Sequence, residues 1–117
     1  ELRAALREIR TALDAYKKAT DEGRVEKIAE TAGYPKSLDI LVAGVPDMRD
    51  PKKRLLRFLR RIPRDPMNPD LEASPQETWG IRSYDSERDA PQGGDDVFDV
   101  FSLSHETGLN GVAYHEW

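Results

Sequence analysis

The hydrophobic pattern of the chain changes once, from helical spacing in the first half to strand-like spacing in the second. Over Glu1–Tyr16, continuing towards Ala19, apolar residues recur every three or four positions with charged residues between them. This period is typical of a helix with one buried face. No Gly or Pro interrupts the stretch, and no Ser, Thr, Asp or Asn cap precedes it. We therefore expect the helix to start upstream of Glu1, in an N-terminal segment that the printed sequence lacks.

Shorter helices are predicted after the first one, which should end near Gly23, a residue suited to the left-handed conformation that follows many helices. Helical spacing resumes over Val25–Ala32 and again over Ser37–Val42. The Asp-Pro pair at 50–51 resembles a helix start, because Asp caps well and Pro fits the first turn. Apolar residues then follow at helical spacing, which predicts a basic helix over 51–62.

The second half of the chain is predicted to be extended. Three prolines make 62–69 a rigid crossing in which regular ladder bonding is not expected. Strands are predicted at Thr78–Tyr84, Val97–Leu103 and Val112–Trp117, and the second has apolar residues on both faces, as a central strand would. The expected fold is α+β: a long N-terminal helix packed on a small antiparallel sheet of about three strands, in one domain over 1–117.

Composition adds a strongly uneven charge distribution to this picture. The 117 residues are 38% hydrophobic and 34% charged, which is typical of a folded domain, and their formal net charge is −4. Seven basic residues and no acidic one give 52–64 a charge of +7, whereas eight acidic residues and one Arg give 85–117 a charge of −7. Segments of opposite charge could make copies of the chain stack, or they could face each other within one molecule.

The sequence offers little catalytic chemistry. The absence of cysteine excludes thiol catalysis, disulfides and thiolate metal sites. His105 and His115 have neither the spacing of a His-Glu-x-x-His motif nor a third ligand at a typical offset, so we predict no zinc site. The acids of 93–96 could bind calcium, but a solvated turn is the favoured interpretation. Asp99 lies in an apolar strand and is expected to pair with an arginine, for which Arg82 is one candidate.

Four segments of the chain carry motifs that occur together in one known family. They are Thr11–Lys17; Gly33–Leu38 with Leu41 and Val42; Ile62–Pro69; and Trp79–Tyr84 with Phe98–Ser104 and a glycine-rich end that closes on Trp117. In this order, and covering most of the chain, they resemble the type II secretion pseudopilins, especially the major subunit, within the wider type IV pilin-like family. The third segment, for example, is close to the family's Leu-Pro-x-Asp-Pro-x-x-Asn-Pro crossing.

This resemblance implies a structural fibre subunit, not an enzyme, with no catalytic residues and no cofactor. An N-terminal apolar half-helix would anchor the protein in the bacterial inner membrane, and the present domain would lie in the periplasm. Its partners would be copies of itself, other pseudopilins and the inner-membrane assembly platform, with no nucleic acid. Charged residues of the first helix and of the basic stretch are the candidate subunit contacts: Arg3, Arg7, Arg10, Asp14, Arg57, Arg60 and Arg61.

Two departures from the family pattern affect these expectations. Val25–Ala32 is extra relative to a typical major pseudopilin. The loop over 104–111, where the family binds calcium through several Asp residues, has one Glu, one Asn and no Asp. Because a hard cation needs several anionic oxygens, we predict no calcium there, with the loop held by its own turn and by packing of Leu109, Tyr114 and Trp117.

Three alternatives remain open from the sequence. A type IV pilin or minor pilin for adhesion, motility or DNA uptake would share the fold. A soluble nucleic-acid-binding module could use the cations of 52–64, although no aromatic ladder for base stacking accompanies them. A small hydrolase built on His105 and His115 is the third.

Overall fold

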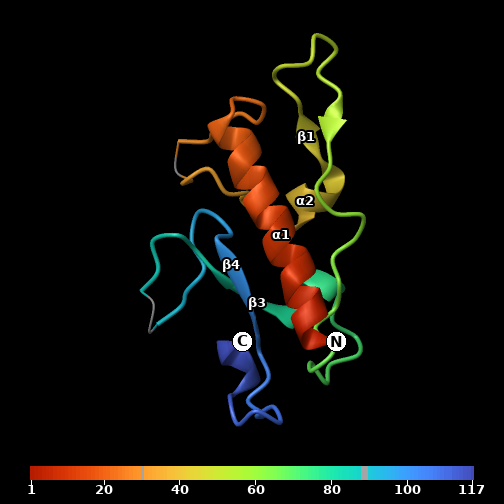
Figure 1. The fold of residues 1–117 in the computed structure, drawn as a ribbon, viewed down its shortest axis with the longest axis vertical. Coiled ribbons are helices and arrows are strands. Elements are labelled where there is room, and N and C mark those ends of the chain that lie inside the picture. Colours follow the sequence, from red (N-terminus) through yellow and green to blue (C-terminus); the bar gives the residue numbers. More distant parts are fainter. Residues whose placement is uncertain (30, 88–89) are drawn as a thin grey trace.

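A computed structural model describes residues 1–29, 31–87 and 90–117 and has an α+β fold with two small antiparallel sheets of two strands each. The elements in chain order are α1 (Leu2–Asp21), α2 (Asp39–Ala43), β1 (Val45–Pro46), β2 (Leu55–Leu56), the 3₁₀ helix η1 (Pro75–Thr78), β3 (Trp79–Arg82), β4 (Asp99–Ser102) and the 3₁₀ helix η2 (Tyr114–Glu116). The molecule is elongated, 49 × 28 × 24 Å, and α1 runs along its long axis (Figure 1).

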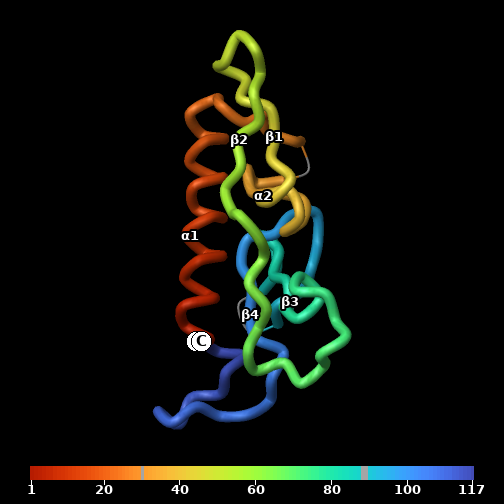
Figure 2. Tube along the Cα trace, turned by 90° about the vertical axis from the view of Figure 1, so that its right-hand side faces the viewer, coloured from red at the N-terminus to blue at the C-terminus, as the bar shows by residue number. Residues whose placement is uncertain are grey.

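The predicted long helix is confirmed as α1, whose 20 residues bury one face. It ends where predicted, since Gly23 has a φ of +77° and the N–H of Arg24 bonds the carbonyl of Ala19. At the other end, Glu1 makes no side-chain capping bond. Figure 2 shows α1 on one side of the molecule, with the rest of the chain packed against a single face of it.

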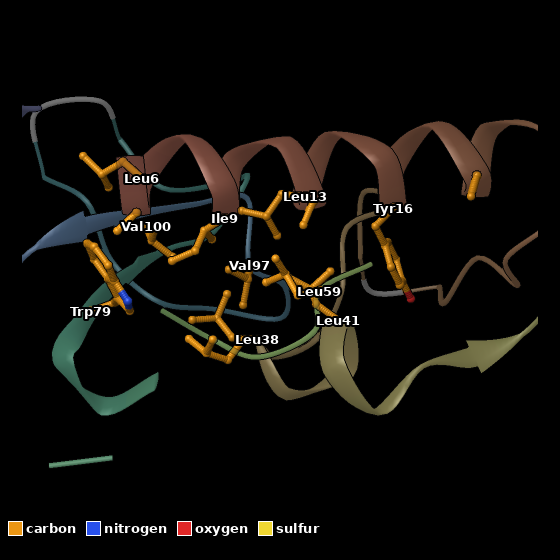
Figure 3. Packing of buried hydrophobic residues seen from close by; sticks show 14 of the residues in the cluster. Leu6, Ile9, Leu13, Tyr16, Leu38, Leu41, Leu59, Trp79, Val97 and Val100 are labelled. Atoms are coloured by element: carbon orange, nitrogen blue, oxygen red, sulfur yellow. The ribbon is translucent and has the colours of Figure 1, made fainter. Parts of the chain in front are cut away.

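The buried face of α1 forms the core together with residues from most later elements (Figure 3). Ile9 and Leu13 of α1, Leu41 of α2 and Val100 of β4 are at most 1% exposed. Burying one such side chain contributes about 1.5–3 kcal/mol, so these contacts are the main reason why α1 stays on the sheet. Trp79 joins the same core, and its indole N–H donates to the carbonyl of Pro63 at 2.8 Å.

Sheet β3–β4 confirms two of the three predicted strands. Residues 79–82 pair with 99–102 in antiparallel register, from Trp79 opposite Ser102 to Arg82 opposite Asp99. The third prediction is wrong, because Val112–Trp117 contains the turn of η2 instead of a strand. The β4 carbonyl of Val100 accepts a hydrogen bond from the Arg10 guanidinium at 3.2 Å. Arg10 of α1 thus bonds a backbone carbonyl of β4 that a third strand would need for pairing.

The prediction that Val97–Leu103 is a central strand covered on both faces is also wrong. The regular strand covers only Asp99–Ser102 and has one strand neighbour. Val100 and Ser102 are fully buried, whereas Leu103 is 46% exposed. The strand therefore buries one face, on α1, and leaves the end of its apolar run in solvent.

The predicted basic helix over 51–62 does not form. Residues 45–56 instead make a hairpin in which Val45 pairs with Leu56 and Pro46 with Leu55. Lys53 has a φ of +49°, outside the helical region. A helix here would place arginines and lysines three and four positions apart on one face without an acidic partner, which is destabilising. The extended backbone after Lys53 separates these charges and still buries Leu59 and Ile62.

The remaining predicted segments give mixed outcomes. The helix at Ser37–Val42 is confirmed, one to two residues later, as α2. The crossing over 62–69 is confirmed as irregular chain without a strand. The helix predicted over Val25–Ala32 is wrong for its described residues, which form turns and bends. Only Val25 is deeply buried among its apolar positions, and this buried surface is too small to stabilise a short isolated helix.

Candidate assembly interface

The fold leaves the outward face of α1, a helix of 20 residues, uncovered. The helical period that buries one face leaves Arg3, Arg7 and Asp14 exposed on the other. Small side chains stand among these charges, with Ala4 and Ala15 also exposed. A helix face with short side chains lets a neighbouring backbone approach closely, and the charges on it can fix the register of that neighbour.

A groove of about 470 Å³ runs between α1 and the chain that follows the hairpin. Arg7 of the helix and Arg60 of the basic stretch line this one groove, so the structure brings together predicted contacts that lie far apart in the sequence. Phe58 fixes the segment to the helix, because its ring meets that of Tyr16 edge-on at 5.3 Å. Arg57 and Arg61 are exposed on the same stretch.

Arg10 has an internal role that the sequence did not suggest. Its Nε donates to the Asp99 carboxylate at 2.8 Å, and its Nη1 donates to the Trp117 carbonyl at 3.0 Å. The expected arginine partner of Asp99 is therefore present, but it comes from α1 and is not Arg82. Arg3 lies over the Trp117 ring, 4.6 Å from the centroid, as in a cation–π contact. These contacts hold the last segment of the chain against α1. That Arg3 and Arg10 also contact a neighbouring subunit remains a prediction.

The two charged segments do not neutralise each other in the described part of the molecule. Four ion pairs form there: Arg10–Asp99, Lys17–Asp21, Arg24–Asp47 and Arg54–Asp50. None of these pairs connects 52–64 with 85–117. Figure 1 places the tip of the basic hairpin at one end of the long axis and residues 104–112 at the other. Within the described residues no ion pair therefore joins the two segments, and their stacking between copies stays a prediction.

Two carboxylates of the hairpin stabilise the turn. The Arg24 guanidinium bonds Asp47 at 3.0 Å and lowers the pKa of its carboxyl, and the Arg49 backbone N–H adds to this effect. The guanidinium of Arg54 and then the N–H of Lys52 lower the pKa of Asp50 in the same way. Asp50 was predicted to cap a helix. It does cap backbone N–H groups, but in a turn.

Two buried carboxylates were not recognised from the sequence. Asp65 is fully buried and accepts the hydroxyl of Ser102 at 2.7 Å and the N–H of Met67 at 2.8 Å. Asp96 accepts the N–H groups of Ala32 and Tyr84, so the solvated turn predicted over 93–96 is wrong for this residue. The bonded state of Asp65 could have been predicted from its place between prolines. In such irregular chain an Asp side chain accepts backbone N–H groups that have no partner in a helix or sheet.

The segment after β4 is held by turn bonds and aromatic packing. Gly108 N–H bonds the Val112 carbonyl at 3.0 Å, and the rings of Tyr114 and Trp117 meet edge-on at 4.9 Å. Leu109 was predicted to pack in this loop but is fully exposed, so that part of the prediction is wrong. Leu109 lines a groove of about 390 Å³ together with Tyr114 and Trp117, but its side chain stays in solvent.

His105 and His115 are both exposed. His115 lines a polar cleft of about 640 Å³ with Arg10, Arg82 and Asp99 among the other lining residues. In the part of the chain that the structure describes, no three His, Cys, Asp or Glu side chains are grouped closely enough to hold a metal ion.

Comparisons of the chain with protein-family models, curated proteins and solved structures found no match. Within the described residues, none of the helices combines the length and the apolar character needed to cross a membrane.

Proposed function

We propose that this chain is a structural subunit of a type II secretion pseudopilus, the periplasmic fibre that supports export of folded proteins. In this proposal the outward face of α1 and the Arg57–Arg61 stretch contact neighbouring copies along the fibre. A contact between two different surfaces of one chain does not close on itself, so it can propagate into a filament.

The observation that carries the proposal is the arrangement of α1. The helix runs along the long axis, packs one face on a small sheet and leaves the other uncovered along its length (Figure 2). A groove beside that face contains both Arg7 and Arg60. The long helix comes first, α2 and the β1–β2 hairpin follow it, and the irregular proline-rich crossing leads into β3 and β4; the helix, α2, the crossing and β3–β4 agree in order with the resemblance drawn from the sequence motifs.

The polar side chains of the interior support a structural role over a catalytic one. Every described buried side-chain nitrogen or oxygen atom has a hydrogen-bond partner. The buried Asp65 and Ser102 bond each other and nearby backbone, with no histidine in the network. These groups stabilise loops and strands.

The test is deletion of the gene in its native host, followed by complementation. We expect loss of folded proteins from the medium, their accumulation in the periplasm, and restoration by the intact gene. If secretion is unchanged while surface pili, twitching motility or DNA uptake is lost, the subunit is a type IV pilin. If none of these phenotypes changes, both fibre functions are wrong.

A second experiment tests the proposed contact surface itself. Arg60→Glu with Arg61→Glu should reduce fibre formation and leave the melting temperature of the domain unchanged, because both side chains are exposed. Lys27→Glu with Lys36→Glu is the matched control, since it makes the same change of charge at exposed positions outside the groove. Equal fibre formation by the two variants would contradict the role of Arg60 and Arg61.

A further inference from the structure

The tip of the basic hairpin combines unpaired cations with exposed apolar side chains. The two acids near the tip, Asp47 and Asp50, form ion pairs with Arg24 and Arg54 and also accept backbone N–H groups of the turn. Further cations at the tip are exposed and form no ion pair with any described residue: Arg49, Lys52 and Lys53. Met48 and Leu55, on the two arms of the hairpin, are 40% and 48% exposed.

The hairpin is also held in a fixed position. The N–H of Met48 bonds the carbonyl of Arg24 at 2.8 Å, and the N–H of Asp47 bonds the carbonyl of Arg54 at 2.9 Å. The first bond joins the hairpin to the chain that leaves α1. A cationic surface presented on an anchored turn loses little conformational freedom when a partner binds, which favours specific recognition.

A segment with the opposite chemistry lies towards the other end of the molecule. Leu71 is 84% exposed and stands between the exposed acids Asp70 and Glu72. The Arg64 guanidinium holds this turn by donating to the backbone carbonyls of Asp70, Leu71 and Ala73. Arg64 bonds these carbonyls and not the carboxylates; Asp70 accepts the N–H of Glu72 at 3.0 Å, and neither acid forms an ion pair with any described residue.

We propose that the hairpin tip over 48–55 docks onto the Asp70–Glu72 turn of a second copy of this chain. Both surfaces pair exposed apolar side chains with charge, and the charges are of opposite sign. In both Figure 1 and Figure 2 the hairpin projects at one end of the long axis, while the 70–72 turn lies at the level of the N-terminus of α1. Two copies displaced along that axis can therefore meet tip to turn, and the same contact can repeat from copy to copy.

This inference rests on the proposed fibre function but names a different contact. The groove that contains Arg7 and Arg60 would join neighbouring copies through the side of the molecule, whereas the hairpin would join them through its ends, and both contacts would repeat along the fibre. An anionic membrane surface or a nucleic acid would suit the cations equally well, but neither explains why the exposed acidic turn carries Leu71. The second copy accounts for both surfaces.

Cross-linking of the full-length protein in membranes tests the contact, and the 117 residues themselves add no native cysteine to the introduced pair. Lys52→Cys combined with Glu72→Cys should give a ladder of oligomers with a short bismaleimide. Lys52→Cys with Asp85→Cys replaces an exposed acid at another site and is the matched control, which should stay monomeric. The ladder should also weaken at 1 M salt, where the screening length is only about 3 Å.

Charge exchange sharpens the same experiment. With the cysteines moved to the exposed Pro51→Cys and Pro69→Cys, so that Leu71 and the charges of both surfaces stay in place, the added changes Lys52→Glu and Lys53→Glu should reduce the ladder about tenfold, equivalent to about 1.4 kcal/mol. Adding Asp70→Lys and Glu72→Lys to that chain should restore it. Failure of the restoration would overturn the charge-paired docking.

Fibre formation and the ladder are scored separately, so the two proposals can fail independently. Fibres with a ladder support both. Fibres without a ladder overturn the hairpin contact and leave the fibre function intact. A ladder without fibres supports the contact and overturns the fibre function, and absence of both overturns both.

Discussion

The helix-and-sheet half of the molecule and the basic hairpin use charge in opposite ways. Around α1, β3 and β4, charged side chains such as Arg10, Asp65 and Asp96 bond groups within the fold and join distant segments. In the hairpin, two acids stabilise the turn, and three cations remain directed at solvent. In the first half these charges hold the fold together, whereas the hairpin leaves charge exposed for the contact that we propose. The stability of the domain should therefore reside almost entirely in the first half.

The largest effect should come from Ile9, which is fully buried in the core. Ile9→Ala removes apolar contacts and leaves a cavity, and we expect it to lower the free energy of unfolding by about 2–5 kcal/mol. Leu55→Ala in the hairpin, where the side chain is 48% exposed, should cost less than about 0.5 kcal/mol. Urea denaturation of both variants measures this contrast, and similar losses would refute it.

A smaller loss is expected at Asp65. Asp65→Ala leaves the Ser102 hydroxyl and the Met67 N–H without their acceptor, which should cost about 1–3 kcal/mol. The control is Asp70→Ala, which removes an exposed carboxylate of the next turn. Thermal melts of the two variants should differ clearly. If they coincide, the buried carboxylate does not stabilise the crossing.

The Arg10–Asp99 pair should contribute about 1 kcal/mol, less than a buried charged hydrogen bond, because its side chains are 35% and 30% exposed. A double-mutant cycle with Arg10→Met and Asp99→Asn measures the coupling directly. A coupling energy near zero would mean that the pair merely forms without joining α1 to β4.

The smallest effect concerns the pH dependence of the hairpin. Asp47 and Asp50 have pKa values lowered below the ordinary 3.8 by their arginine partners, so their stabilisation is complete above pH 3.8 and is lost as the pH falls through the lower folded values. The protection factors of the Asp47 and Met48 amides, corrected for the intrinsic pH dependence of exchange, should therefore fall in acid. In Asp47→Asn with Asp50→Asn this local pH dependence should disappear, and its persistence would assign it to other groups.

The parts of the fold that could be predicted are those decided by local pattern. Residue spacing and residue type are enough to predict the buried face of α1 and the strands around Trp79 and Val100. They are not enough to predict the hairpin, because Leu55, Leu56 and Leu59 fit a helix as well as a strand. The pairing partner that decides between the two, Val45, lies ten residues before the strand. A local pattern cannot show where such a partner lies.

The candidate interface was predictable only in part for the same reason. Exposed charges on an amphipathic helix follow from the helical period, so Arg3, Arg7 and Asp14 could be named. Arg10 lies on the same helix, yet its partner Asp99 is 89 residues away, and no spacing rule connects them. Which charges point outwards and which join segments of the fold depends on tertiary contacts.

The central proposal is that the chain is a fibre subunit, and the family resemblance on which it rests implies an apolar helical segment before α1. Intact-mass measurement and N-terminal sequencing of the mature protein, isolated from its native membranes, test it most directly. The account predicts a largely apolar stretch of about 20 residues, long enough to span a bilayer, joined without a break to Leu2. A mature protein that begins at or near Glu1, or one with a polar segment before it, would contradict the account.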